Sequence, residues 1–201
     1  MVSDLYKMHM SKLGVVVVSS NHPCESLTSL ALEHARSLSC AAVEVVVEKR
    51  NTCVATWDND AVSSAISFGP EEKSNMTVLA YLRGGRCGRV SGGVGSDASV
   101  RRMVDLAVER AAASTASNTA GPADKYAQND QGLGLYDKRQ SQLTDESRET
   151  VVNENVEDVR SQAGVEPMAF HYTEELVHRQ VVNSGGLEQY EMSTRYTLLG
   201  R

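Results

Sequence analysis

The sequence is poor in aromatic residues and has no long apolar run. Phe, Trp and Tyr make up 5% of the 201 residues, whereas 41% are hydrophobic, so the core has to be built largely from aliphatic side chains. The apolar run Leu13–Val18 is far shorter than the ~20 residues of a membrane-spanning helix. It also lacks the length and the small-residue cleavage site of a signal peptide. The sequence therefore predicts a cytoplasmic protein that does not enter a membrane.

Closely spaced cysteines and a basic stripe are also absent. Cys24, Cys40, Cys53 and Cys87 are widely separated without a C-x-x-C motif, which favours reduced thiols. The net charge is −6, and the densest basic cluster has no interleaved aromatic residues, so nucleic acid is not expected as a partner. We interpret this cluster as a solvated rim; it consists of Arg83, Arg86, Arg89, Arg101 and Arg102.

Motifs for common catalytic chemistries are missing or incomplete. His171 and His178 are an odd number of positions apart in an expected strand, so they point to opposite faces and do not form a metal pair. A serine-nucleophile elbow would need a glycine after Gly93-Val94-Gly95-Ser96 that the sequence lacks. Gly93-x-Gly95-x-x-Ala98 matches a dinucleotide fingerprint in its letters, but no parallel strands or downstream acidic residue are expected around it. A flexible strand-to-helix loop is therefore the preferred interpretation of 92–98.

Three segments have helical periodicity. The first, Pro23–Leu38, places Leu27, Leu30, Ala31, His34 and Leu38 on one face, and His34 is interpreted as a satisfied boundary residue. The second, Ser99–Ser114, is amphipathic and can be capped by Ser96, Asp97 or Ser99. The third covers about Asp145–Ala163, with Thr144 or Asp145 as its cap and Gly164 as its C-terminal stop.

Valine-rich alternation predicts β-structure in the remaining segments. Val43, Val45 and Val47 are expected on the core, with Glu44 and Glu48 on a solvated face. Two breaks are expected, a turn at Arg50–Asn51 and a breaker at Gly69–Pro70. The expected later strands are Thr52–Trp57, Met76–Leu82, Arg86–Val90 after a Gly84–Gly85 turn, Met168–Val182, and Leu187–Leu199 after a turn at Ser184–Gly186.

This order of elements predicts an α+β fold. We expect a mostly antiparallel sheet with two or three helices packed on one side, ending in a long β-hairpin. Residues 1–20 are expected to be a leader or a poorly defined start, and 21–201 a single domain. The polar segment at about 115–143 is expected to be a long surface loop.

Four passages in a fixed order carry a resemblance to known proteins. They are Ala41–Val47 after the first helix, Arg83–Gly88 before a small-residue loop and helix, Leu135–Asp137, and Val181–Leu187 with Thr194 beyond it. Together they resemble the TldD/PmbA family, metalloprotease-related proteins also called modulators of DNA gyrase. The sequence departs from the family pattern at Ala41-Ala42, where the family has Gly-Ala, and at 89–93, where the family has an aromatic residue and an alanine.

The resemblance implies the amino-terminal α+β domain of a peptidase that works as a two-protein assembly, with metal in one partner only. The family's His-Glu-x-x-x-His helix lies downstream of this domain, and the motif does not occur before Arg201. The resemblance thus implies no cofactor and no catalytic residue in this chain. Zinc is expected only in a catalytic partner or a missing downstream domain. The chain is expected to be a truncated or split gene product, or a separate subunit, and inactive alone.

The function expected from the resemblance is a non-catalytic part of a TldD/PmbA-like metallopeptidase system that acts in peptide processing or proteolysis. Expected partners are a TldD/PmbA-like subunit, as a heterodimer or homodimer, and unfolded or extended peptides, which could add as a strand to the final hairpin. Two alternatives stay open: a stand-alone peptide- or protein-binding module, and a nucleotide-binding enzyme. The candidate contact residues are Arg83, Gly85, Asn183, Ser184, Gly186 and Thr194.

Overall fold

The computed structural model describes residues 9–10, 16–17, 23–38, 40–59, 67–116, 121–122, 136–139, 143–162, 164, 167 and 169–200. Most of the predicted leader (1–20) and most of the predicted loop at about 115–143 lie outside these ranges. The elements are β1 (His9–Met10), β2 (Val16–Val17), α1 (Glu25–Arg36), β3 (Ala42–Asp58), β4 (Ser67–Leu82), β5 (Arg86–Gly93), α2 (Asp97–Ala113), α3 (Asp145–Arg160), β6 (Ala169–Asn183) and β7 (Glu188–Gly200).

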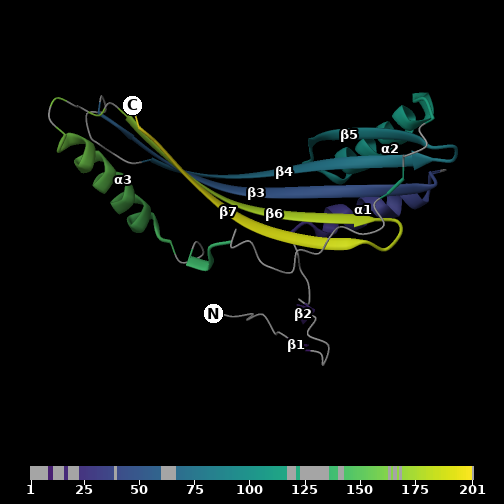
Figure 1. The fold of residues 1–201 in the computed structure, drawn as a ribbon, viewed down its shortest axis with the longest axis horizontal. Coiled ribbons are helices and arrows are strands. Elements are labelled where there is room, and N and C mark those ends of the chain that lie inside the picture. Colours follow the sequence, from purple (N-terminus) through teal and green to yellow (C-terminus); the bar gives the residue numbers. More distant parts are fainter. Residues whose placement is uncertain are drawn as a thin grey trace.

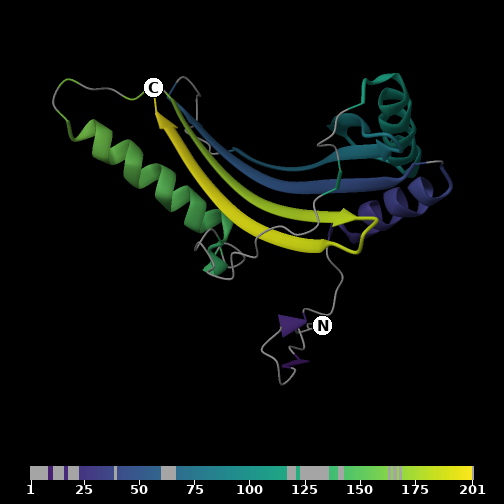
Figure 2. The same cartoon turned by 45° about the vertical axis from the view of Figure 1, so that its right-hand side comes forward.

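A five-stranded sheet in the order β5-β4-β3-β6-β7 organises the chain. Each pair of neighbouring strands in it is antiparallel. Strands β3, β4 and β6 have 17, 16 and 15 residues, about three times the usual strand length. Figures 1 and 2 show these strands bending along their length, with α1 and α2 at one end of the sheet and α3 at the other. The predicted α+β fold with a long final hairpin is confirmed.

The helices at both ends pack on the same face of the sheet. Val43, Val45 and Val47 belong to a core cluster with α1 and α2, and Ala55 and Trp57 belong to a second cluster with α3. All five are odd-numbered residues of β3, whose register with β4 and β6 runs without a bulge. Their side chains therefore project from one face. We call it the helix face, and the opposite side the open face.

Small side chains bring α1 and α2 close to the sheet and to each other. Cys24, Thr28, Ala31 and Ala35 are the buried residues of the α1 region, so the buried stripe lies slightly to one side of the predicted leucine stripe. His34 Nε2 lies 2.8 Å from Asp105 Oδ1 of α2, which confirms its interpretation as a satisfied boundary residue. The helix α2 begins at the predicted cap, since Ser96 Oγ accepts from Ser99 N at 3.3 Å.

The helix α3 is held by a smaller apolar cluster and by its N-terminal cap. Val152 and Val156 are buried, and they pack with Trp57 and Phe170, whose rings meet edge to face at 6.2 Å. The guanidinium of Arg160 lies 5.5 Å from the centre of the Trp57 ring, a distance typical of a cation–π contact. Thr144 caps α3 as predicted, with its Oγ1 accepting from Ser147 N at 3.2 Å.

The two predicted interruptions of the sheet are wrong. Strand β3 passes straight through Arg50–Asn51, and β4 passes through Gly69–Pro70 in register with β3. Pro70 is tolerated because β5 pairs with β4 only from Asn75 onward, so the missing N–H falls where β4 is an edge. Arg50 and Asn51 lie in the stretch of β3 between the two helix clusters, where polar side chains on a strand remain in contact with water.

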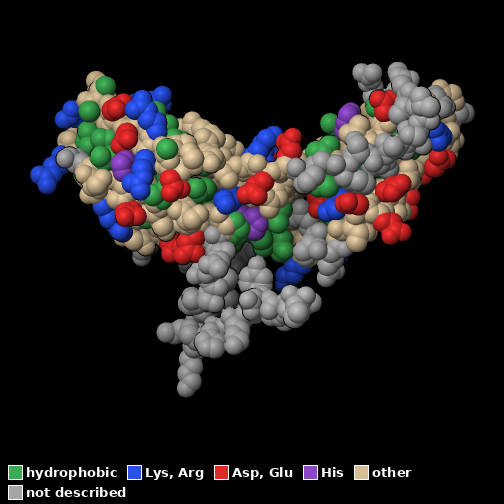
Figure 3. Space-filling view, turned by 180° about the vertical axis from the view of Figure 1, so that it is seen from behind, with side chains coloured by type: hydrophobic (Ala, Val, Ile, Leu, Met, Phe, Trp, Pro, Cys, Tyr) green, Lys and Arg blue, Asp and Glu red, His purple; other side chains and the backbone are tan. Residues whose placement is uncertain are grey.

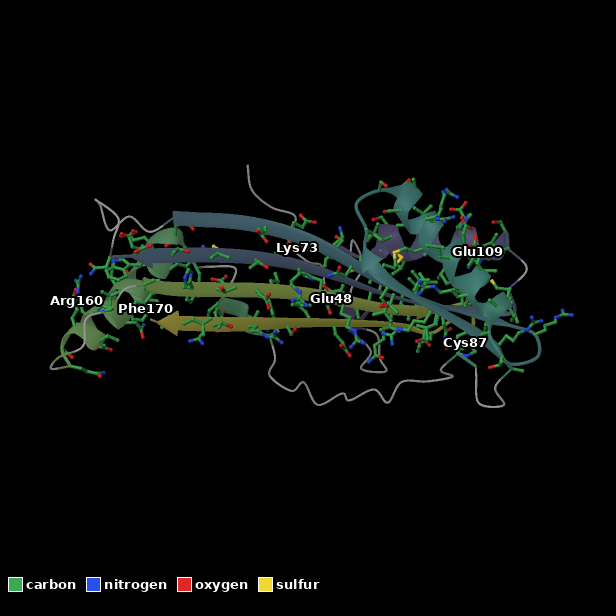
Figure 4. All side chains as sticks on the ribbon, turned by 90° about the horizontal axis from the view of Figure 1, so that it is seen from above. Glu48, Lys73, Cys87, Glu109, Arg160 and Phe170 are labelled. Atoms are coloured by element: carbon green, nitrogen blue, oxygen red, sulfur yellow. The ribbon has the colours of Figure 1, made fainter. Side chains whose placement is uncertain are left out.

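The middle of the sheet is polar on its open face. Arg50 lies 2.6 Å from Glu48 and 3.5 Å from Glu175. Figure 4 places Glu48 and Lys73 midway along the sheet, with Cys87 and Glu109 at one end and Arg160 and Phe170 at the other. The space-filling view in Figure 3 shows basic and acidic side chains side by side at the narrow waist between two lobes. Charged residues in long strands therefore mark the uncovered part of this sheet.

Glu44 differs from its predicted environment. It is 5% exposed, although it was expected on a solvated face with Glu48. Glu44 lies opposite Leu79 on β4 and Asn183 on β6, and Tyr81 on the same face is also buried. Neighbouring strands on both sides therefore cover Glu44, and the alternation of residues along β3 alone does not predict this.

Within the described part of the chain, no helix is long and apolar enough to cross a membrane.

Candidate functional site

The structure brings five of the six candidate contact residues to one end of the sheet. Arg83 and Gly85 lie in the β4–β5 turn, and Asn183, Ser184 and Gly186 lie at the β6–β7 turn. Both turns are tied to the start of β3, which runs between them. Ala41 N donates to Tyr81 O at 2.8 Å, and Ser184 N donates to Val43 O at 2.9 Å. Thr194, the sixth candidate, lies farther along β7.

The β6–β7 turn uses Asn183 and Ser184 to build its own backbone. Asn183 is 5% exposed, and its Oδ1 accepts from Gly185 N at 2.9 Å and Leu187 N at 3.0 Å. Ser184 Oγ accepts from Val43 N at 3.1 Å, and Gly186 has a φ of 92°, which favours glycine. These side chains therefore have structural roles, and contacts with a partner stay a prediction.

Replacing Asn183 with alanine is expected to lower the free energy of unfolding by about 1–2 kcal/mol, because two partly buried N–H groups lose their acceptor. Asn183→Asp keeps an oxygen at the acceptor position and is expected to recover most of the loss. Urea denaturation followed by circular dichroism measures both variants. Equal losses for alanine and aspartate would show that the acceptor is not what stabilises the turn.

The 136–139 segment is fastened to the helix face of β7 at Thr194. Asp137 N donates to Thr194 Oγ1 at 3.0 Å. Bonds from Arg139 hold the pKa of the Asp137 carboxyl below its usual value, and partial burial raises the pKa of the neighbouring Tyr196. The predicted contact residue Thr194 thus joins this segment to β7.

The two edges of the sheet are protected differently. At β5, Val94 N donates to Ser74 O. Because backbone bonding alternates along an antiparallel pair, the even-numbered residues of β5 bond to β4 and the odd-numbered ones face away. The N–H and C=O groups of Arg89 therefore point away from β4. The outward carbonyl of Arg89 is covered, because Arg110 Nη1 of α2 donates to it at 2.8 Å. A charged side chain over an edge is a known defence against unwanted strand pairing.

At the β7 edge, the outward groups belong to even-numbered residues. Asn183 N donates to Leu187 O, and the β6–β7 register is continuous, so odd-numbered residues of β7 bond to β6 and even-numbered residues face away from it. Met192, Tyr196 and Leu198 are among the outward-facing set. Strand β7 has 13 residues without proline or lysine, and β6 is its one neighbour among the described strands. Among the described residues, the 136–139 segment contacts β7 at Thr194, and no proline or lysine of β7 protects the rest of this edge.

A buried ion pair near the α3 end of the sheet was missed from the sequence. Arg148 donates to both carboxylate oxygens of Glu174, at 2.9 and 3.0 Å, and Tyr172 Oη lies 3.3 Å from the same carboxylate. Side-chain exposure is 13% for Arg148 and 3% for Glu174. The bonds to Glu174 raise the pKa of Arg148, and burial raises that of Tyr172. The one sequence signal is that strand alternation places Glu174 on the helix face.

No group of three potential metal ligands comes together within the described residues. His171 and His178 lie on opposite faces of β6, since they differ in parity along an uninterrupted strand. Burial raises the pKa of all four cysteine thiols, which lowers the fraction of reactive thiolate at neutral pH. The residues described here do not fit a zinc site.

The start of α2 does not resemble a nucleotide-binding loop. Its N-terminus is occupied by its own serines, because Gly95 N and Ser96 N both donate to Ser99 Oγ, at 3.2 and 3.1 Å. The strand before it, β5, is antiparallel to its neighbour, whereas the dinucleotide fingerprint belongs to a parallel βαβ unit. The segment 92–98 is a strand end, a short loop and a helix start, in agreement with the preferred interpretation.

Comparisons with known proteins give a likeness in structure. No protein-family model and no curated protein sequence matches the chain. A candidate modulator of DNA gyrase from Bacteroides thetaiotaomicron matches with a TM-score of 0.69 and 16% identity over 87% of this chain and 39% of its own. TldE from Thermococcus kodakarensis matches with a TM-score of 0.61 and 12% identity over 86% of this chain and 38% of its own.

A second candidate modulator of DNA gyrase, from Thermotoga maritima, matches with a TM-score of 0.62 and 12% identity over 87% of this chain. This chain spans 39%, 38% and 38% of the lengths of the three proteins. At such identities the likeness establishes the fold alone. The chain therefore has a TldD/PmbA-type fold, as its sequence passages predict.

Proposed function

We propose that this chain is a non-catalytic, peptide-holding part of a TldD/PmbA-like metallopeptidase system. The observation that carries the proposal is the edge of β7, which pairs with no described strand other than β6, in a chain with a TldD/PmbA-type fold. The peptidase role comes from the family resemblance of the sequence. The holding role comes from the geometry of the edge.

The β7 edge is suited to bind the main chain of a peptide. Its outward N–H and C=O groups alternate along one line, and a strand that adds to them forms hydrogen bonds through its backbone. Backbone bonding is largely independent of side-chain identity, which suits a system that handles unfolded peptides of varied sequence. The Arg110 guanidinium over Arg89 makes the β5 edge the poorer receptor.

In this proposal, zinc and the cutting of peptides belong to a partner subunit or another domain, as the resemblance implies. The chain's own contribution is to hold a peptide in extended form and to prevent it from folding on itself. The turns that carry Arg83 and Asn183 lie together at one end of the sheet, and we assign this end as the surface that contacts the partner subunit.

Co-purification tests the assignment to a peptidase system. The tagged chain, expressed in its native host, is expected to retain a protein that carries His-Glu-x-x-x-His. A matched bait with Arg83→Glu at the assigned end is expected to retain less of that protein, whereas Lys73→Glu, midway along the sheet, is expected to retain as much as the unmodified chain. Recovery of no such protein with the unmodified bait would contradict the metallopeptidase assignment.

The same β7 edge supports a second candidate function, a stand-alone peptide-binding module. This second function is favoured because a peptide backbone could pair with β7 without the help of another subunit. Saturable binding of extended peptides by the purified chain, combined with failure to recover a metallopeptidase subunit, would favour this function over the first. Hydrolysis of peptides by the chain alone would contradict both.

A further inference from the structure

We infer that the 136–139 segment regulates the β7 edge by autoinhibition. The segment closes the middle of the edge, and a long peptide pairs with the whole of β7 only after the segment has been displaced. This inference deepens the proposed function and rests on it, because it assumes that peptides add to the β7 edge. We call residues 136–139 the strap; Figure 1 shows its short coil beside the start of α3.

The strap is attached to the centre of β7. Asp137 N donates to Thr194 Oγ1 at 3.0 Å, and the Tyr196 hydroxyl donates to the Asp137 carboxylate. Thr194 is the seventh of the 13 residues of the strand. Thr194 and Tyr196 are both even-numbered, so their backbone groups face away from β6. The strap therefore contacts two residues whose backbone groups a peptide would pair with in the middle of the edge.

The charged side chains around Tyr196 already have partners. Within the strap, Asp137 Oδ1 accepts from Arg139 N at 2.9 Å and from Arg139 Nε at 3.0 Å. On the other side of Tyr196, its β6 neighbour Glu174 accepts from Arg148. A peptide side chain that entered the helix face beside Tyr196 would therefore compete with the strap for the same position, and no free charge is left there to bind it among the groups named.

Competition arises because an added strand needs room on both faces of the sheet. Its side chains alternate between the faces, and each lies next to a β7 residue on the same face. Every second side chain of a peptide that runs past Thr194 would enter the helix face beside Thr194 or Tyr196. These are the positions where the strap is bonded, so the peptide and the strap exclude each other at the centre of β7.

With the strap in place, the edge is divided into two short pieces. They are Glu188–Ser193 and Thr197–Gly200, and each contains less than half of the 13 residues of β7. Affinity in strand addition comes from main-chain hydrogen bonds, so a peptide confined to one piece loses most of them. The strap itself is held to β7 by hydrogen bonds that each contribute little after exchange with water. A long peptide can therefore displace it.

Substitutions on both sides of the contact test the inference. The probe is a fluorescein-labelled peptide of valine and threonine with a lysine at each end and with as many residues as β7, 13. Asp137→Ala changes only the strap, and Thr194→Val removes the hydroxyl that accepts from Asp137 N. Fluorescence anisotropy is expected to show about fivefold tighter binding for each variant, because the fraction of molecules with an open edge rises.

Thr197→Val is the matched control, since it makes the same change on the open face of β7. It is expected to alter peptide affinity by less than about twofold.

Amide exchange in the unmodified chain gives a second measurement, which a folding defect in a variant does not affect. Saturating peptide is expected to speed exchange of the Asp137 amide several-fold, because its bond to Thr194 is lost, and to slow exchange at Met192 and Tyr196. Slower exchange at Asp137 in the presence of peptide would make the strap part of the peptide site and overturn autoinhibition.

The outcomes separate this inference from the proposed function. Binding of the peptide with equal affinity by the unmodified chain, Asp137→Ala and Thr194→Val would overturn autoinhibition and leave peptide holding intact. Weaker binding by both variants would also overturn it. Binding by none of the three proteins would count against peptide holding itself, and the inference would fall with it.

Discussion

Replacing Gly88 with alanine is expected to lower the free energy of unfolding by about 3 kcal/mol or more, at the upper end of the usual overpacking range. A Cβ at this position would lie 2.1 Å from Ala107 O and 2.3 Å from Ala111 N of α2. Both atoms belong to the backbone of a helix, so the clash cannot be relieved by turning a side chain. The helix has to move away from β5, which opens the core around Val104 and Val78.

Gly92 provides the matched control. It lies in the same strand and on the same face as Gly88, and a Cβ there would have no atom within 4 Å. Gly92→Ala is expected to change the free energy of unfolding by less than about 1 kcal/mol. Chemical denaturation measures both variants. If Gly88→Ala were as stable as Gly92→Ala, the close contact between α2 and β5 would be incorrect.

Replacing Glu174 with alanine is expected to cost about 3 kcal/mol, because it leaves the guanidinium of Arg148 partly buried without its main partner. The side chains of Glu174 and Arg148 are 3% and 13% exposed. Asp145, which lies 3.0 Å from Arg148, retains part of the interaction. The loss is expected to appear first as local opening of α3, measured by hydrogen exchange of the Val152 and Val156 amides.

Glu175→Ala tests whether this effect is specific to the buried pair. Glu175 points to the open face, where its partners Arg50 and Arg195 are 35% and 72% exposed. The side chain of Glu175 is 16% exposed, but both of its partners reach water, and pairs of this kind contribute about 1 kcal/mol or less. If Glu174→Ala and Glu175→Ala were equally destabilising, burial of the Arg148–Glu174 pair would not be what stabilises α3.

Periodicity and capping predicted most of the elements correctly. The helices begin close to the predicted caps Ser96 and Thr144, because a side-chain acceptor at the N-cap is a local property of the sequence. The positive φ angles of Gly84 and Gly85, 83° and 74°, agree with the predicted tight hairpin. Signals confined to a few neighbouring residues can be read without knowledge of the rest of the fold.

The predictions that were wrong depend on residues far apart in the sequence. Arg50–Asn51 is a turn signal in isolation, yet Arg50 pairs with Glu48 and Glu175 within a continuous strand. Glu44 has the appearance of a solvated residue, and it is buried between neighbouring strands. Local pattern cannot identify which strands lie on either side, so it cannot distinguish a polar residue in water from one that is covered.

The candidate site could be predicted only in part. The motif around Asn183 and Ser184 pointed to a hairpin, and the structure gives both side chains a role in forming it. The Arg148–Glu174 pair joins a helix to a strand across a long polar segment, and no sequence spacing reveals it. The register of β7 with β6 decides which backbone N–H and C=O groups of β7 face outward. That register can be derived only when β6 is known to be the partner strand.

Amide exchange along β7, measured by NMR with and without an extended peptide, tests peptide holding most directly. The account predicts that peptide slows exchange at the outward residues Met192, Tyr196 and Leu198. Ser193 and Arg195, already bonded to β6, should change little. Unchanged exchange at the outward residues under saturating peptide, or slowing confined to β5, would contradict the account.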